Sequence, residues 1–574
     1  MPSQLTVLIL GGYGAFGGRL AHLLCDEPRV HLVIAGRSCA KADAFCAALP
    51  GKAARTPAAV DRDGDVAVAI AAQRPDIVVD ASGPFQAYGR DPYRVVRAAL
   101  AIGAHYLDLA DGSEFVRNII EVDAAAKGAD RFVLTGASSF PVLHAAVLRH
   151  LARGVATVES STVGIAPVPY AGVGSTVMRA IAGYAGKPLR LLRDGRPSTG
   201  YALCETRRFT IAPPGRVPLA PLTYSLVDVP DLEALALVRP EIQSVWAGAA
   251  PTPAFLHWCL RVLAHCVRLH LVPSLAPLAP AMHRVANATK LGEQRGGMFV
   301  EMRGLRADGV PVTRSWHLVA EGEDGPNIPS MAAEILVRRV LEGNAPAPGA
   351  RAAVHEIELA EYERAFARRA IHCGERSDER RGDVPLYRAI LGDAWRALPQ
   401  ALRDVHGSVI TSSVAGRASV ERGSGLLARL VAMLFRFPPA AEDVELKVTF
   451  KRERGVETWQ REFGSHRFTS VQFLGSGRYE GLLCERFGPF TFGLALVVLG
   501  GKLELVVRRW SLLGIPLPLR VAPRSESFET DAQRRFEFSV AIDLPLAGRV
   551  VRYSGWVEPA STEALDAAQQ TYLD

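Results

Sequence analysis

The sequence predicts an α/β Rossmann domain with an inserted α+β second domain, followed by a mainly antiparallel β domain. Three observations lead to this prediction. The apolar segment 5–10 runs into a glycine-rich turn and then a helix, the order found at the start of a parallel sheet. Strand and helix patterns alternate up to about residue 135. After residue 385, short strands separated by glycine and proline dominate.

The domain boundaries follow from length and from changes in pattern. At 574 residues the chain is too long for one core, since single cores stop growing at about 250–300 residues. We expect a Rossmann domain at 1–135, a second domain at 136–345 and a β-rich domain at 385–574. Residues 346–384 hold a Pro/Ala segment and the charged run GERSDERRGD, which predicts a linker.

Composition and charge exclude several classes of protein. Hydrophobic residues make up 49% and charged residues 22%, which is typical of a globular protein. The net charge of +7 comes from scattered cations without a basic run, so nucleic-acid binding is not expected. The eight cysteines contain no C-x-x-C pair, so we expect no metal site and a reducing, cytoplasmic compartment.

The segment 254–272 is the one most similar to a membrane-binding element. Basic residues interrupt it, so it is not expected to span a bilayer. Apolar residues such as Phe255 and Val262 alternate at helical spacing with basic ones such as Arg261. That pattern fits a helix lying on a membrane surface. It fits equally a surface helix that packs its apolar face on a domain, and we favour this second interpretation.

Gly12, Gly14 and Gly17 form the pattern G-x-G-x-x-G directly after the first predicted strand. In dinucleotide-binding domains the first glycine makes a tight turn, the second admits a pyrophosphate, and the third lets the helix pack on the strand. The N–H groups at the start of the helix, at Ala15 and Phe16, then face the phosphates. The alternative is a glycine turn without a ligand, but the order of strand, turn and helix favours a nucleotide site.

The residues after the second predicted strand, 30–35, distinguish NADP from NAD. NAD-binding domains place Asp or Glu here to hold the ribose 2′-hydroxyl. This chain has Arg37 and Ser38 instead. A guanidinium can bind a 2′-phosphate through two hydrogen bonds. We therefore predict NADP as the cofactor, against the alternative of a surface arginine in a turn.

A further cofactor contact is expected after the strand at 76–80. Ser82, Gly83 and Pro84 follow this strand, at the edge where open α/β sheets bind ligands. Backbone without bulky side chains suits close approach of the nicotinamide ribose. We therefore assign these three residues to the cofactor site.

Titratable residues near the same edge are the candidates for proton transfer. We predict catalytic roles for Tyr88, Asp108 and His144, and Tyr106 and Asp111 are further candidates. Each also has a structural alternative. The two aspartates could cap the helix that begins near residue 113, and the histidine could be an ordinary helix residue after a proline.

Five stretches together resemble the NADP-binding domain of the saccharopine dehydrogenase (saccharopine reductase) family. They are LILGGYGAFGGRLAHLL, IAGRS, DIVVDASGPFQAYG, HYLDLADG and GASSFPVLHAAVL, and they cover roughly residues 5–150. In that family the second domain is inserted and a helix then returns to the Rossmann unit. The resemblance implies that residues 331–341 are this helix. Between about 170 and 290 the likeness to true saccharopine-forming enzymes is weak, so no amino-acid specificity is implied.

The C-terminal part resembles an uncharacterised bacterial domain that is often fused behind saccharopine-dehydrogenase-like modules. The stretches that carry this likeness are TWQREFGSHRFTS, ERFGPFTFGLAL and VRYSGWVEP. The resemblance implies no activity for this domain.

Two functional hypotheses remain open. The first is an NADP-dependent oxidoreductase acting on an unidentified small carbonyl or imine, with a dimer possible. The second is a non-catalytic, cofactor-bound module whose C-terminal β-domain binds a lipid or a protein partner. The intact phosphate-binding glycines favour the first hypothesis, whereas the few acid or base residues around residues 83–85 favour the second.

The C-terminal strands carry many large apolar and aromatic residues. Strands with so few helices to cover them predict a wide curved sheet, and such sheets can enclose an apolar cavity. We predict a concave apolar pocket in residues 440–557 that accepts a hydrophobic ligand, with Arg461 or Arg508 at its edge. The alternative is a core filled by side chains.

Overall fold

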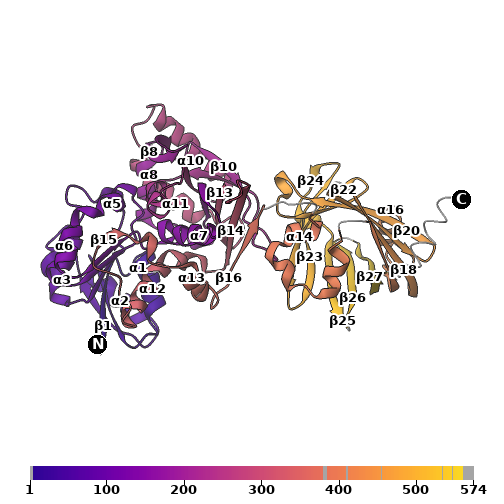
Figure 1. Cartoon of the computed structure of the whole chain (residues 1–574), viewed down its shortest axis with the longest axis horizontal. Coiled ribbons are helices and arrows are strands. Elements are labelled where there is room, and N and C mark those ends of the chain that lie inside the picture. Colours follow the sequence, from indigo (N-terminus) through magenta and orange to yellow (C-terminus); the bar gives the residue numbers. More distant parts are fainter. Residues whose placement is uncertain are drawn as a thin grey trace. The chain divides into compact units, whose positions relative to one another are not determined.

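The computed structural model describes residues 4–378, 384–408, 411–453, 455–532, 534–545 and 547–559 (Figure 1). The chain divides into two compact units. The N-terminal unit comprises Met1–Phe209 and Leu222–His372, and the barrel unit comprises Thr210–Pro221 and Cys373–Asp574.

The N-terminal unit contains a seven-stranded parallel sheet in the order β15-β6-β5-β4-β1-β2-β3. Its strands are β1 (Leu5–Leu10), β2 (Val30–Gly36), β3 (Ala54–Ala59), β4 (Ile77–Asp80), β5 (His105–Asp108), β6 (Phe132–Thr135) and β15 (Gly349–Ala352). Helices α1 (Ala15–Leu24), α2 (Cys39–Ala48), α3 (Val66–Gln73), α4 (Arg94–Ala101), α5 (Ser113–Arg117) and α6 (Asp123–Gly128) lie between the strands in the chain. The apolar sequences of β1 and β4 fit a sheet buried on both faces, and the predicted Rossmann fold is confirmed.

The same unit contains a second, mixed sheet in the order β10-β11-β12-β7-β13-β14-β16, although only Ile371 and His372 of β16 fall within this unit. Its strands are β7 (Thr157–Ala166), β10 (Thr206–Phe209), β11 (Leu222–Leu226), β12 (Ser244–Ala249), β13 (Arg295–Leu305), β14 (Pro311–Glu321) and β16 (Ile371–Ser377). A hairpin of β8 (Pro188–Arg193) and β9 (Arg196–Tyr201) stands apart. The helices are α7 (His144–Leu151), α8 (Ser175–Tyr184), α9 (Asp231–Val238), α10 (Ala254–Arg268) and α11 (Ala279–Ala288). This is the expected α+β second domain.

Helix α12 (Ile328–Leu341) returns to the Rossmann sheet, as the resemblance implied for residues 331–341. Ser330 donates a hydrogen bond to the Phe16 carbonyl oxygen at 3.0 Å. Arg338 donates another to the carbonyl oxygen of Leu23, also at 3.0 Å. Both acceptors lie on α1, so the returning helix packs directly against the helix that follows the glycine turn.

The predicted linker at 346–384 is wrong over most of its length. Strand β15 pairs in parallel with β6, and helix α13 (Leu359–Phe366) follows it. Strand β16 then forms one edge of the second sheet. Proline, alanine and charge suggested an unstructured segment, but Ala350 and Tyr362 are buried. The charged run lies partly in residues 379–383, which are outside the described residues.

The predicted packing of α10 is also wrong. We expected the apolar face to be buried and the basic face to be exposed. Instead His257 is buried and its Nε2 atom lies 2.8 Å from the Ser225 hydroxyl. Phe255 and Trp258 on the same helix remain 53% and 62% exposed. A buried polar partner therefore decided which face of the helix points inward.

None of the described helices combines the length and apolar character that crossing a bilayer requires.

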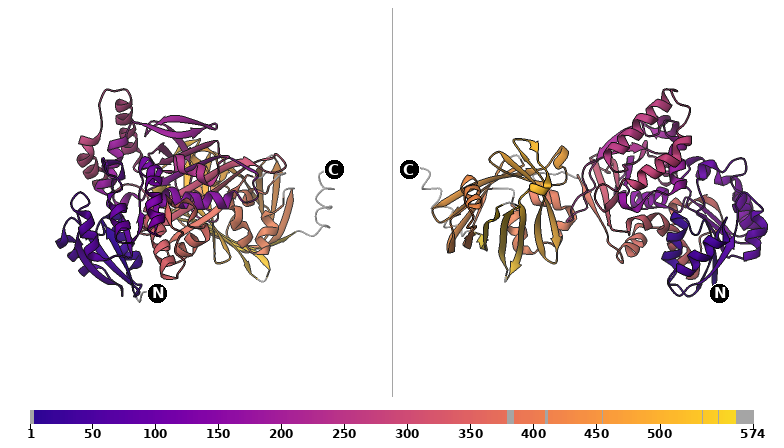
Figure 2. Two further views of the ribbon diagram at one scale, coloured as in Figure 1. Left: turned by 60° about the vertical axis from the view of Figure 1, so that its left-hand side comes forward. Right: turned by 180° about the vertical axis from the view of Figure 1, so that it is seen from behind.

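The barrel unit is a closed antiparallel barrel, because β22, the first strand of the order, pairs with β23, which only the short strand β24 follows. Figure 2 shows the barrel strands from behind. The strands are β17 (Ser412–Arg422), β18 (Ala441–Glu453), β19 (Val456–Phe463), β20 (His466–Leu474), β21 (Leu483–Phe487), β22 (Phe490–Leu499), β23 (Lys502–Leu512), β24 (Ile515–Pro516), β25 (Arg524–Ala532), β26 (Arg535–Leu544) and β27 (Gly548–Pro559). Helices α14 (Leu386–Leu391), α15 (Gln400–His406) and α16 (Leu426–Leu434) accompany them. The predicted antiparallel β domain is confirmed.

The barrel encloses a cavity of about 350 Å³. The predicted apolar pocket is therefore present, although residues before 440, such as Tyr387 and Phe435, also line it, and the alternative of a completely filled core is wrong. Of the two arginines proposed for its edge, Arg461 lines the cavity and Arg508 does not.

Candidate functional site

The turn between β1 and α1 has the geometry that a bound pyrophosphate requires. Gly14 stands immediately before the first helical residue, and no side chain caps the N-terminus of α1. The first N–H groups of a helix have no intrahelical acceptor. The start of α1, where the predicted residues Ala15 and Phe16 lie, can therefore bind an anion.

The three glycines of the motif differ in the space around them. A Cβ at Gly17 would lie 2.4 Å from the Gly11 carbonyl oxygen, and one at Gly12 would lie 2.7 Å from that of Ile9. These two positions are closed by the protein's own backbone. A Cβ at Gly14 would meet only the Gly11 residue, at 3.0 Å from its oxygen, and would otherwise point into open space. Gly14 therefore has the free side that a phosphate group needs.

Tyr13 fixes the turn that carries Arg37 and Ser38. Its hydroxyl accepts a hydrogen bond from the Ser38 backbone N–H at 3.1 Å. Its ring lies so close to Gly36 that a Cβ there would be 2.6 Å away. Arg37 is exposed, and no described residue forms a hydrogen bond or ion pair with its guanidinium. Arg37, which we predict to bind the 2′-phosphate, is thus held near the glycine turn, and its guanidinium is free to bind an anion.

The end of β4 forms a buried polar cluster around the predicted residues Ser82 and Tyr88. The Ser82 hydroxyl donates to Asp80 Oδ1 at 2.6 Å, and the Tyr88 hydroxyl donates to Asp80 Oδ2 at 3.1 Å. The guanidinium of Arg62 lies 3.4 Å above the Tyr88 ring. Burial and the Asp80 carboxylate raise the pKa of Tyr88, so its hydroxyl keeps its proton at neutral pH. Gly83 and Pro84 continue from this cluster into the turn before α4.

Asp108 links the ends of strands β5 and β6 through hydrogen bonds. Its Oδ1 atom accepts hydrogen bonds from the Gly136 N–H at 2.7 Å, the Ala110 N–H at 3.0 Å and the Thr135 hydroxyl at 2.9 Å. Its Oδ2 atom has no partner among the described residues. Burial raises the pKa of Asp108 to about 7. Tyr106 is buried within β5 near this carboxyl.

Asp108→Asn is expected to make the free energy of unfolding less dependent on pH. A raised pKa means that the wild type loses stability as pH rises through about 7, by at most about 1.4 kcal/mol per pH unit for one group. The amide oxygen of Asn can accept the same three hydrogen bonds without becoming charged. Urea unfolding at pH 6 and pH 8 should show a smaller difference in the variant. An unchanged difference would show that Asp108 does not titrate in this range.

Two further carboxyl groups, those of Asp111 and Asp228, lie beside the turn after β4. Gln86 donates a hydrogen bond to Asp111 at 3.3 Å, and the Ser113 hydroxyl donates to Asp228 at 2.6 Å. Burial, with the nearby charge of Asp228 as second cause, raises the pKa of Asp111 to about 6. Burial and the same two carboxylates raise the pKa of Tyr184. Two close carboxyl groups with a tyrosine are an arrangement that can hold and transfer a proton.

His144 lies elsewhere in the unit and is fully buried. Its Nδ1 atom is 2.6 Å from Asp231 and its Nε2 atom is 2.8 Å from the Ser161 hydroxyl. Both ring nitrogens are therefore engaged with residues outside the predicted site. The structure brings Ser82 and Tyr88 together, but it does not join His144 to them.

Three further residues near Asp111 were not predicted from the sequence: Asp228, Tyr184 and Gln86. Asp228 and Tyr184 belong to the second domain and lie more than 70 positions from Asp111 in the sequence. No local pattern marks them, because they reach Asp111 only when the second domain folds onto the first sheet. The alternative that Asp111 caps α5 is wrong, because α5 begins at Ser113 and the residue before it is Gly112, with no side-chain cap.

Comparisons with known proteins agree with this fold. Residues 7–132 match the family model described as the saccharopine dehydrogenase NADP binding domain. Residues 398–557 match the domain of unknown function DUF4166. The two resemblances predicted from the sequence are confirmed for these ranges, which identify a dinucleotide-binding domain and a C-terminal domain without an assigned activity.

Several solved structures match this chain at low identity. Saccharopine dehydrogenase (L-Glu forming) from Saccharomyces cerevisiae is 15% identical with a TM-score of 0.45, over 65% of this chain and 99% of that chain. GenD2 from gentamicin A biosynthesis, in complex with NAD, is 16% identical with a TM-score of 0.30, over 60% and 89%. The WlbA (WbpB) dehydrogenase from Thermus thermophilus, in complex with NAD and alpha-ketoglutarate, is 14% identical with a TM-score of 0.28, over 60% and 90%. No match is found among proteins with curated functions.

Proposed function

We propose that the N-terminal unit is an NADP-dependent oxidoreductase that reduces a small carbonyl or imine. The observation that carries this proposal is the position of Asp111. This carboxyl contacts Gln86, two residues after the Gly83-Pro84 turn assigned to the nicotinamide ribose, and its pKa is raised to about 6. A titratable carboxyl beside a dinucleotide site is what proton transfer near neutral pH requires.

Reduction of a C=O or C=N bond needs a hydride on carbon and a proton on oxygen or nitrogen. NADPH supplies the hydride when it is bound. Asp111 supplies the proton from its protonated form, and the nearby Asp228 charge helps to keep that proton on Asp111. Tyr88 orients the turn after β4 through its hydrogen bonds to Asp80 and Ser82. In this proposal Asp111 takes the catalytic role, and Tyr88 and Asp108 are positioning residues.

A spectrophotometric screen tests the proposed reaction. Oxidation of NADPH at 340 nm is followed with aldehydes, ketones and pairs of an amine with an oxoacid. Turnover with one class identifies the substrate class. If NADPH binds and no class gives turnover, the second hypothesis is favoured.

That second hypothesis is a non-catalytic, cofactor-bound module whose barrel binds a lipid or a protein partner. The cavity of about 350 Å³ inside the barrel is the observation in its favour. Barrels of this kind hold small ligands without any chemistry of their own. The two hypotheses are separated by turnover, since both require cofactor binding.

Arg37→Asp is expected to reverse the cofactor preference. In the wild type we expect NADPH to bind at least about tenfold more tightly than NADH, because an exposed guanidinium can pair with the 2′-phosphate. A carboxylate at this position would repel the phosphate and accept a hydrogen bond from the ribose 2′-hydroxyl. Titration of both cofactors by fluorescence provides the measurement.

Lys52→Asp is the matched control, because it reverses one exposed charge just before β3, at the amino-terminal end of the parallel strands, whereas Arg37 follows the carboxyl end of β2. It should leave the preference for NADPH unchanged. Equal affinities of the wild type for the two cofactors would contradict the assignment of NADP.

A further inference from the structure

The cavity in the barrel unit is lined mainly by aromatic and aliphatic side chains. They come from strands all around the barrel and from helix α16, and include Phe450, Phe463, Leu494, Val507, Trp510 and Phe538. Pockets that hold small molecules have volumes of about 300–1,000 Å³ and are mostly apolar with a few polar groups. The cavity of about 350 Å³ falls within this range and has the same composition.

The charged side chains in the wall of the cavity are already paired. Arg461 lies 3.3 Å from Glu485, and both contact the Ser470 hydroxyl. Glu529 lies 2.6 Å from Nε2 of the buried His406. Among the described residues, the cavity-lining charges are thus one arginine and two glutamates, and each of them has a partner. Within this part of the chain, no unpaired cation lines the cavity to receive a carboxylate or a phosphate.

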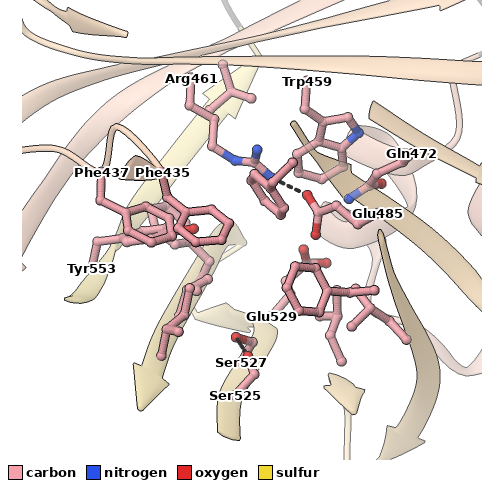
Figure 3. A pocket seen from close by; sticks show the side chains of 18 of the residues that line it. Phe435, Phe437, Trp459, Arg461, Gln472, Glu485, Ser525, Ser527, Glu529 and Tyr553 are labelled. Carbon is pink, nitrogen blue, oxygen red and sulfur yellow. Dashed lines mark hydrogen bonds and ion pairs between the residues drawn. The ribbon is translucent and has the colours of Figure 1, made fainter. Parts of the chain in front are cut away.

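Two neutral polar groups in the wall have no such partner. Gln472 is 1% exposed, and its Oε1 atom accepts no hydrogen bond from any described residue. The hydroxyl of the buried Tyr387 likewise completes no hydrogen bond with a described residue, and the Gln472 side chain is its polar neighbour. Burial, followed by the nearby Glu529 and Glu485 charges, raises the pKa of Tyr387, so this hydroxyl remains a donor. Figure 3 shows Gln472 beside Glu485 and Trp459, across the pocket from Phe435 and Phe437.

A buried acceptor without a donor costs roughly 1–3 kcal/mol, so a native protein usually satisfies it. A hydroxyl group can both donate to Gln472 Oε1 and accept from Tyr387. An alkyl or aromatic body attached to that hydroxyl would contact the apolar walls. A carboxylate or an ammonium group would instead lose its hydration and find only charges that are already paired.

We propose that the barrel binds a neutral amphiphile, a small molecule with an apolar body and one hydroxyl group, inside this cavity, with Gln472 and Tyr387 binding the hydroxyl. This site lies wholly within the barrel unit and does not depend on the reaction proposed for the N-terminal unit. It defines the ligand class for a domain that has no assigned activity.

Four probes of equal chain length test the proposal on the full chain by isothermal titration calorimetry. They are 1-octanol, octanoate, octylamine and octane, compared at neutral pH. We expect 1-octanol to bind most tightly. Gln472→Leu should weaken 1-octanol binding about tenfold, since one buried hydrogen bond is lost, and should leave octane binding unchanged.

Gln460→Leu is the matched control, because it makes the same chemical change on β19, the strand paired with β20, at a position that does not line the cavity. It should bind all four probes like the wild type. Val507→Trp places a larger side chain in the cavity and should abolish binding of every probe. The melting temperature of each variant reports whether it is folded. If Gln472→Leu does not fold, Tyr387→Phe is measured in its place.

Three results would overturn the proposal. Tightest binding of octanoate or octylamine would show that the cavity recognises a charge. Unchanged 1-octanol affinity in the folded Gln472→Leu or Tyr387→Phe variant would show that the proposed hydrogen bonds do not form. Retained binding in Val507→Trp, or no binding of 1-octanol to the wild type, would show that the cavity is not the site.

Discussion

Gly14→Val is expected to abolish NADPH binding while the N-terminal unit stays folded. The backbone of Gly14 is extended, with φ of −83° and ψ of −178°, which any residue can adopt. A Cβ there meets the Gly11 oxygen at 3.0 Å, so a small shift suffices inside the protein. The two methyl groups of valine would then occupy the space in which the pyrophosphate approaches the helix N-terminus. Fluorescence titration with NADPH measures the loss, and circular dichroism checks the fold.

Gly17→Val provides the contrasting variant. Its Cβ would lie 2.4 Å from the Gly11 oxygen and 3.0 Å from Gly12 Cα, and both are backbone atoms that cannot move independently. We expect it to lower the free energy of unfolding by about 1–3 kcal/mol or more, as overpacking does. Gly14→Val should therefore lose the cofactor without losing stability, whereas Gly17→Val should lose stability. Undiminished NADPH binding by Gly14→Val would show that the motif is only a turn.

Asp111→Asn is expected to reduce kcat by about 10²–10⁴-fold with the substrate found in the screen, because the general acid is lost. The affinity for NADPH should not change, since Asp111 is not among the residues assigned to the cofactor. A carboxyl that donates a proton is active below its pKa, so reduction by the wild type should slow as pH rises above about 6. The variant should lack this decline, and stopped-flow rates between pH 5 and pH 8 provide the measurement.

Asp228→Asn distinguishes proton transfer from a structural role of Asp111. Removing the Asp228 charge removes one of the causes that raise the pKa of Asp111. The decline in rate should then move to lower pH while substantial activity remains. An Asp111→Asn variant with normal kcat would refute the assignment of the acid, although NADP binding and the Rossmann fold would stand.

Local sequence was sufficient to predict the glycine turn and the strand and helix on either side of it. The strand Leu5–Leu10, the glycine turn and helix α1 are adjacent in the chain, and the turn depends on close backbone approaches that a side chain would block. Arg37 follows directly from the end of β2, so its place near the turn also depends on local structure. The alternation of apolar and polar residues was sufficient to predict most of the barrel strands, because each strand has one face toward the interior.

Tertiary structure decided what depends on contacts between distant segments. Charge and proline suggested a linker at 346–384, yet β15 pairs with β6, because strand pairing depends on a partner more than 200 positions away. A buried hydrogen bond between His257 and Ser225 oriented α10 against its hydrophobic pattern. Asp228 joins Asp111 through folding of the second domain, and Gln472 becomes an unpaired acceptor only when the barrel closes. The sequence by itself determined the backbone motif and the strand periodicity. The tertiary structure decided which polar groups were buried, and with what partners, because desolvation and hydrogen bonding act between residues that the chain order does not bring together.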